Sequence, residues 1–130
     1  FTFLGFTHYC DTSRKGKFMV GRKTSQKKFR AKCKEMNNWL MDIRNCKKAK
    51  EWWPIVQAKL RGHYQYYGVS GNMRSLRRYY ALTLRMVHKW LNRRSQRKSF
   101  SWESFLKYVK RYPLPMPKIV HNFYTLSPVM

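Results

Sequence analysis

Acidic residues are scarce in this sequence. The 130-residue chain contains 29 Lys and Arg but only five Asp and Glu, so its formal net charge is +24. The acids are also scattered along the chain, at Asp11, Glu35, Asp42, Glu51 and Glu103. Two-metal phosphoryl-transfer enzymes need grouped carboxylates that hold the ions about 3.5 to 4 Å apart. We therefore expect this chain alone not to be an enzyme, with no catalytic residue, no metal site and no cofactor.

Cysteines and long apolar runs are also few. Cys10, Cys33 and Cys46 are odd in number and form no CxxC, which argues against a disulfide framework or a zinc knuckle and fits a reducing cytosol. The four histidines show no ligand spacing, so we expect His63 and His88 to be packed or half-exposed. No apolar run approaches the roughly 20 residues of a membrane span. We expect a cytoplasmic protein with no membrane partner.

Aromatic and basic residues are abundant instead. Trp, Tyr and Phe make up 17% of the chain, which predicts one domain with a single aromatic-rich core. The charge of +24 far exceeds the net charge of about 2 to 8 that solubility requires. Because the basic residues run throughout the chain, they indicate a charged binding surface for an anionic partner rather than a localisation signal.

The clearest helical pattern spans residues 60–91 and predicts two helices joined by the turn at residues 68–71. We expect Gly68 to end the first helix in a left-handed conformation and Asn72 to cap the second helix. Gly62 costs about 1 kcal/mol relative to Ala inside a helix, so another group is expected to approach the backbone there. The apolar positions of the second helix are Leu76, Tyr80, Thr83, Val87, Trp90 and Leu91.

The complete pattern predicts a mainly α fold. Residues 1–23 read as a β-hairpin, residues 24–112 as a bundle of three to four helices, and residues 113–130 as an extended, proline-rich tail. Residues 52–54, Trp-Trp-Pro, are expected to begin the second helix, with the proline in its first turn. The two tryptophans either cover the helical core or stack on bases. The apolar stripe of the first helix is Phe29, Cys33, Met36, Leu40 and Ile43, and Ser99 or Ser101 is expected to cap the fourth helix.

The cations fall opposite the apolar stripes and indicate a nucleic-acid-binding surface. Lys and Arg that neutralise phosphates supply most sequence-independent affinity. Tyrosines alternate with arginines in RGHYQYYG and RSLRRYY, a combination suited to irregular or single-stranded RNA. The alternatives are that the charges form a solvated face and that the tyrosines belong to the core. The candidate binding residues are Lys27, Arg30, Lys34, Arg61, Arg74, Arg77, Arg78, Arg85, Lys89, Arg93 and Arg94.

Four segments also carry a family resemblance. FLGFTHYC, LRGHYQYYGVSGN, LNRRSQRKSFSWESF and RYPLPMP occur in this order. Together they resemble the maturase-specific thumb region, domain X, of bacterial group II intron reverse transcriptases. The similarity covers the chain from Phe3 to about Tyr124.

The resemblance implies a thumb-like helical bundle that grips a template–primer duplex and clamps the intron RNA to assist splicing. Phe3, Leu4, Gly5 and Phe6 match the last palm segment of the family, a hairpin that supports the primer end, although each Phe could equally be core. The implied partners are group II intron RNA, the RNA/DNA template–primer duplex and the missing palm and fingers domain. The parent polymerase would need Mg²⁺, held by palm aspartates that this chain lacks. The implied location is the bacterial cytoplasm, in a nucleoid-associated ribonucleoprotein.

Two other functions remain open from the sequence. The chain could be one part of a split reverse transcriptase that needs a separate palm chain, or a generic basic structural protein that binds nucleic acid. The sequence begins in mid-pattern at Phe1, without an initiator Met, and is expected to be a piece of a longer polypeptide.

Overall fold

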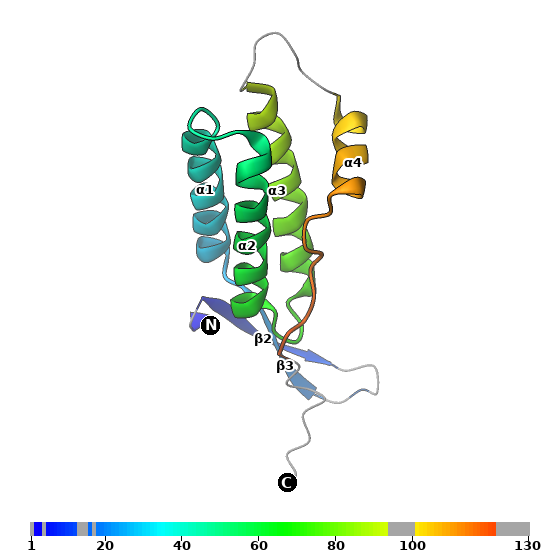
Figure 1. Cartoon of the computed structure of the whole chain (residues 1–130). Helices are drawn as coiled ribbons and strands as arrows, with labels where there is room; N and C mark the ends of the chain where they lie inside the picture. The colour runs from blue at the N-terminus through cyan, green and yellow to red at the C-terminus, as the bar shows by residue number, and fades with distance from the viewer. Residues whose placement is uncertain (1, 4, 13–15, 17, 94–100, 122–130) are drawn as a thin grey trace.

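A short sheet stands at one end of an up-and-down arrangement of helices (Figure 1). The computed structural model describes residues 2–3, 5–12, 16, 18–93 and 101–121. The elements are β1 (Thr2–Phe3), β2 (Phe6–Thr12), β3 (Phe18–Thr24), α1 (Gln26–Ile43), α2 (Ala49–Tyr67), α3 (Met73–Arg93) and α4 (Trp102–Arg111). The predicted hairpin and mainly helical fold are confirmed.

The β-hairpin is formed by β2 and β3, which pair antiparallel with Phe6 opposite Thr24. The sequence did not predict β1, a two-residue strand that pairs with β2 across a turn at Gly5, where φ is 83°. A residue with a side chain would be strained in that conformation. Tyr9 lies opposite Gly21, and its ring occupies the space that a Cβ at position 21 would need. The missing side chain of this glycine therefore lets the ring lie flat on the hairpin.

The first predicted helix is confirmed in α1. Ser25 is its N-cap, and the Ser25 hydroxyl accepts a hydrogen bond of 3.2 Å from the amide of Lys28. Such a bond satisfies one of the amides that have no partner in the first helical turn. The predicted stripe faces inward, with Phe29, Met36 and Leu40 buried and Cys33 and Ile43 partly buried.

Helix α2 begins earlier than the sequence predicted. It starts at Ala49, so Pro54 lies in its second turn, where it cannot donate the helical hydrogen bond to the carbonyl of Lys50. The burial of the neighbouring Trp52 and Trp53, only 0% and 6% exposed, compensates for this lost bond. The two tryptophans therefore belong to the core, as the first of the two interpretations proposed, and are not available for stacking on bases.

The turn between α2 and α3 corrects the prediction for Gly68. Its φ of −78° and ψ of 59° are not left-handed, and the amide of Val69 bonds the carbonyl of Tyr67 at 2.8 Å, as in an inverse γ-turn. Glycine is required because a Cβ would collide with the carbonyl of Tyr64. The left-handed residue of this turn is Gly71, with φ of 89°.

Asn72 does not cap α3 with its side chain, contrary to the prediction. The side chain is fully buried and points instead to the junction between β3 and α1. Its Oδ1 accepts a hydrogen bond from the Thr24 amide at 2.7 Å, and its Nδ2 donates to Thr24 Oγ1 at 2.9 Å and to the Tyr67 carbonyl at 2.7 Å. One side chain thus joins the end of β3, the end of α2 and the start of α3.

The chain after α4 runs along α2 in an extended conformation. Residues 113–121 are called the tail below, and residues 122–130 lie outside the described part of the chain. Three α2 side chains donate to carbonyls of successive residues: Trp53 Nε1 to Tyr112 at 3.1 Å, Gln57 Nε2 to Pro113 at 3.1 Å, and Tyr64 OH to Pro115 at 2.8 Å. Leu114 is buried in the core, and the amides of Val120 and His121 both donate to the carbonyl of Gly68.

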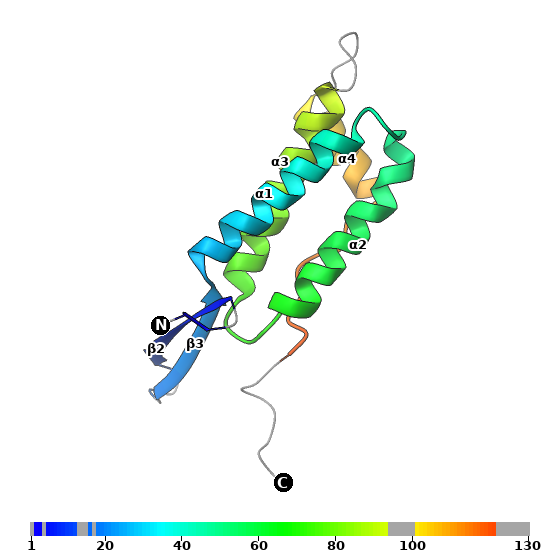
Figure 2. The same ribbon diagram turned by 90° about the vertical axis from the view of Figure 1, so that its left-hand side faces the viewer.

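The core lies where α1 and α2 both pack on α3, while α1 and α2 hardly touch each other (Figure 2). Helix α4 adds Phe105 and Val109 to this core. Within the described ranges, no helix is long and apolar enough to cross a membrane.

We predict that Asn72→Ala lowers the free energy of unfolding by about 3 kcal/mol, because it leaves the buried Thr24 amide and Tyr67 carbonyl without their partner. Urea denaturation measures this loss. The control is Asn38→Ala at an exposed position of α1, which should change stability by less than about 0.5 kcal/mol. Equal effects of the two substitutions would contradict the role assigned to Asn72.

Candidate nucleic-acid interface

The predicted binding residues of α3 lie on one side of the helix. At about 100° per residue, their positions fill an arc opposite the buried side chains Leu76, Tyr79, Thr83, Val87 and Trp90. All of them are exposed: Arg74, Arg77, Arg78, Arg85, Lys89 and Arg93. Arg94 lies outside the described residues.

The predicted residues of α1 border this arc. Lys27, Arg30 and Lys34 are exposed, and with Asn37 they form a row at three- and four-residue spacing. Asn37 Oδ1 accepts a hydrogen bond of 2.8 Å from Trp90 Nε1, so this row lies next to α3. We call the combined surface the α1/α3 cationic face: Lys27, Arg30, Lys34, Arg74, Arg77, Arg78, Arg85, Lys89 and Arg93.

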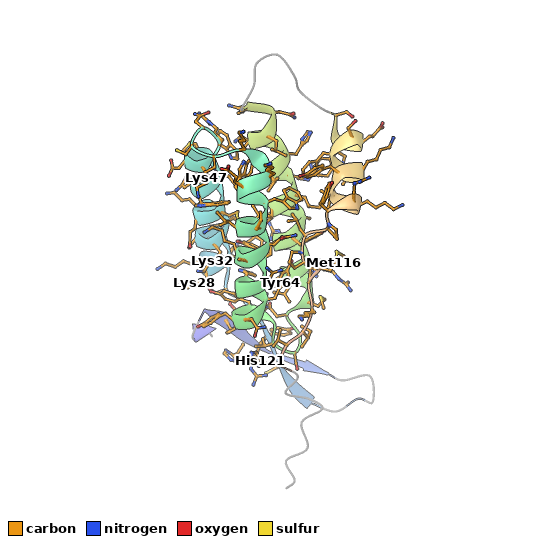
Figure 3. All side chains as sticks on the ribbon, in the orientation of Figure 1. Lys28, Lys32, Lys47, Tyr64, Met116 and His121 are labelled. Carbon is orange, nitrogen blue, oxygen red and sulfur yellow. The ribbon has the colours of Figure 1, made fainter. Side chains whose placement is uncertain are left out.

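Arg61 is not part of this face. It is exposed on α2 and lines a cavity of about 290 Å³ with Tyr64 and with Pro115 and Met116 of the tail. Figure 3 labels Tyr64 and Met116, which lie where the tail passes α2. The structure therefore brings together the predicted cations of α1 and α3 but separates the predicted cation of α2 from them.

The cations of the α1/α3 cationic face have no acidic partners. Among the described residues, none of them forms an ion pair with a carboxylate, and α3 contains no Asp or Glu at all. Several guanidinium groups lie over aromatic rings, with Arg78 4.9 Å from the Phe29 ring centroid and Arg85 5.7 Å from that of Trp102. Stacking uses the flat side of a guanidinium and leaves its N–H edge available for a phosphate.

The segment that resembles a primer grip is held by the helices. Phe6 is only 8% exposed, and its ring centroid lies 5.3 Å from Tyr67 and 6.0 Å from Tyr66. Gly5 accepts a hydrogen bond of 2.8 Å from the Ser25 amide. Phe3 is part of β1, and Leu4 lies outside the described residues. The core interpretation of Phe6 is therefore confirmed, whereas a contact with a primer stays a prediction.

A column of stacked rings is the feature that the sequence pattern missed. His63 lies between Tyr79, at 3.8 Å and 4° between ring planes, and Tyr67, at 4.7 Å and 29°. Tyr79 is buried, whereas Tyr80, predicted for the core, is only partly buried. The spacing of four residues between His63 and Tyr67 was the available signal, since such side chains meet on a helix. The prediction that His63 is packed is confirmed.

Burial controls the protonation of this column. It lowers the pKa of His63 from 6.5 to about 4, and the charge of Lys32 lowers the pKa further. Burial also raises the pKa of Tyr79 and of Tyr67. At neutral pH the imidazole is therefore uncharged, and the two hydroxyl groups keep their protons.

The prediction of a close approach to Gly62 is wrong for the described residues. No heavy atom lies within 4 Å of the position that a Cβ would occupy there. Gly62 instead borders a cavity of about 440 Å³ between α1 and α2, which we call the α1/α2 cavity. Its floor includes Tyr79 of α3, and its lining includes Lys28 and Lys32 of α1 (Figure 3).

The other reactive side chains form no cluster. Within the described residues, no three of His, Cys, Asp and Glu come together as metal ligands would. All three cysteines are free. Cys33 is half-buried, and its burial raises the pKa of the thiol although the positive charge of Arg78 opposes this.

Comparison of the chain with protein-family models, with curated proteins and with solved structures finds no match in any of the three. The fold and the surface described above therefore carry the functional argument.

We predict that lowering the pH from 7 to 5 reduces stability through His63. Because its folded pKa, about 4, is below its unfolded value of 6.5, the unfolded chain binds more protons between these values. The contribution is complete above pH 6.5 and is lost as the pH falls toward 4. The free energy of unfolding should fall by about 2 kcal/mol through this group.

Urea denaturation of the original chain and of His63→Gln at both pH values isolates this contribution. The variant should show a smaller decrease by that amount, whereas His88→Gln should retain the His63 contribution. An identical pH dependence in the original chain and His63→Gln would disprove the assignment.

Proposed function

We propose that this chain is an RNA-binding module, the maturase and thumb region of a group II intron reverse transcriptase. In this proposal the α1/α3 cationic face binds the phosphate backbone of structured intron RNA and of the template–primer duplex. The chain supplies the grip, and a palm domain with its Mg²⁺-binding aspartates supplies the polymerase chemistry.

The observation that carries the proposal is the set of exposed cations on α1 and α3 without carboxylate partners. Each cation that meets a phosphate releases a condensed counterion, which lowers log K by roughly 0.7 to 0.9 per decade of salt. Uncompensated positive charge on a folded surface is unfavourable until a polyanion neutralises it. A face built in this way is therefore suited to a nucleic acid.

The layout of the face also supports a ligand with a regular backbone. Its cations come from two adjacent helices of a rigid core, and stacking on Phe29 and Trp102 restrains two of the guanidinium groups. Fixed charges lose less conformational entropy on binding than mobile ones do. The order of the four sequence segments further supports the group II intron assignment.

We predict that replacing Arg74, Arg77 and Arg78 together by Gln weakens the binding of structured RNA and reduces the magnitude of the salt slope, d log K/d log [salt], by about 2. Fluorescence anisotropy between 50 and 300 mM salt measures both effects. The three positions are exposed, so the fold should remain intact.

A matched control removes three charges from another face. Lys107, Lys110 and Arg111 are exposed on α4, outside the α1/α3 cationic face. Replacing them by Gln should leave the slope nearly unchanged. Equal slopes for the two triple variants would mean that only net charge matters, and this would remove the α1/α3 cationic face from the interface.

Two comparisons test the alternatives from the sequence. A generic basic protein should bind ordinary duplex DNA as tightly as structured intron RNA at the same salt concentration. Part of a split enzyme should restore primer extension when a palm domain is added as a separate chain. The proposed module should prefer the structured RNA.

A further inference from the structure

The α1/α2 cavity lies on the opposite side of α1 from Lys27, Arg30 and Lys34. It has a volume of about 440 Å³, within the range of small-molecule sites in proteins. Lys28, Lys32 and Lys59 contribute cations to its lining, and Tyr66, Tyr79 and His63 contribute aromatic rings. Because α1 and α2 pack on α3 rather than on each other, the cavity is a consequence of the helix arrangement (Figure 2).

Inside this lining, His63 is a polar group with no partner. The side chain is only 7% exposed, and its Nε2 makes no hydrogen bond within the described residues. A buried polar atom without a partner typically costs about 1 to 3 kcal/mol. Such an atom in the wall of a cavity indicates a ligand that completes its hydrogen bonding.

Gly62 keeps the cavity open at its rim. Glycine in the interior of a helix is unfavourable, and no contact in the described structure requires it here, because the space around its Cβ position is empty. A larger side chain at this position would project into the cavity that Gly62 lines. The helix therefore carries a destabilising residue where only an open cavity benefits from it.

The lining favours a nucleobase over an acidic ligand. Tyr66 is 52% exposed and stacks on Phe6 with 11° between the ring planes, so a second flat group can stack on its other side. The polar atom in the wall belongs to a neutral imidazole, which suits a base edge, and the lysines suit the attached phosphate. Glu35, paired with Lys32 at 3.5 Å, also lines the cavity and would repel a carboxylate.

We propose that the α1/α2 cavity binds one unpaired nucleotide of an RNA, with its base stacked on the tyrosines and hydrogen-bonded to His63, and with its phosphate contacted by Lys28, Lys32 or Lys59. This inference rests on the proposed RNA-binding function and deepens it. An α-helix with its side chains is about 10 to 12 Å across. A backbone on the α1/α3 cationic face can therefore extend one nucleotide over α1 into the cavity.

The test uses two RNA duplexes that differ in one base. The first has a single-adenosine bulge, and the second has an abasic ribose at the same place. The full chain should bind the first about tenfold more tightly, within the range that base–aromatic stacking supplies. Gly62→Leu, which fills the cavity, and Tyr66→Ala, which removes the exposed ring, should abolish this preference. Tyr112→Ala, at another exposed tyrosine outside the cavity, should retain it.

Stability measurements keep the test decisive. Gly62→Ala should raise the urea midpoint, because Ala is the better helix former and no atom lies within 4 Å of its Cβ position. If Gly62→Leu does not fold, Tyr66→Ala decides the outcome.

Equal binding of the two RNAs by the original chain would overturn the inference, and so would a preference that survives both cavity variants. Competition by an acidic peptide that is lost in Gly62→Leu, without a preference between the RNAs, would make the cavity a peptide site and would also overturn it. The salt slope on the abasic RNA reports the α1/α3 cationic face separately, so either proposal can fail alone.

Discussion

The three hydrogen bonds of the Asn72 side chain are the constraint on which the arrangement of the helices depends. They tie Thr24, where β3 leads into α1, to Tyr67 and to the residue that precedes α3. The direction in which α1 leaves the sheet is thereby fixed relative to α3. The alignment of cations from these two helices on one face, and the separation of α1 from α2 that leaves a cavity, both follow from this single buried amide.

The core stabilises the charged surface by sharing its aromatic rings with it. Trp90 donates a hydrogen bond to Asn37, while Arg44, Lys89 and Arg93 lie over its ring at 4.7, 4.7 and 5.6 Å from the centroid. Each cation at such a position gains a modest electrostatic attraction that does not require an acid. A chain with a charge of +24 and few carboxylates can hold its basic side chains in place in this way.

The sequence predicts what local periodicity encodes and misses what tertiary contacts decide. The helices and the exposure of their cations follow from residue spacing alone, because an amphipathic helix must turn its apolar side inward. Asn72 before α3 had the local signature of a cap, but the distant Thr24 amide is its partner. Gly68 was assigned a left-handed conformation, while the carbonyl of Tyr64 is the group that excludes a side chain there. These contacts join residues that no periodic pattern relates.

The candidate site shows the same division. The spacing places Arg61 on an exposed side of α2, but it cannot show that the tail, rather than α1, lies beside that side. The α1/α2 cavity depends on how far two helices stand apart, which is set by the third helix beneath them. Gly62 could be recognised as unusual from the sequence, yet only the empty space beside it indicates its role.

The way in which the tail is attached to α2 determines which of its positions can vary. Trp53, Gln57 and Tyr64 hold it through main-chain carbonyls, an interaction that any amino acid can provide. Most tail side chains are therefore free to drift in evolution, whereas Leu114, which fills the core, is not. The prolines contribute through the extended backbone that they impose. Related chains should accordingly conserve the shape of this segment, and the α2 donors that hold it, more strictly than its spelling.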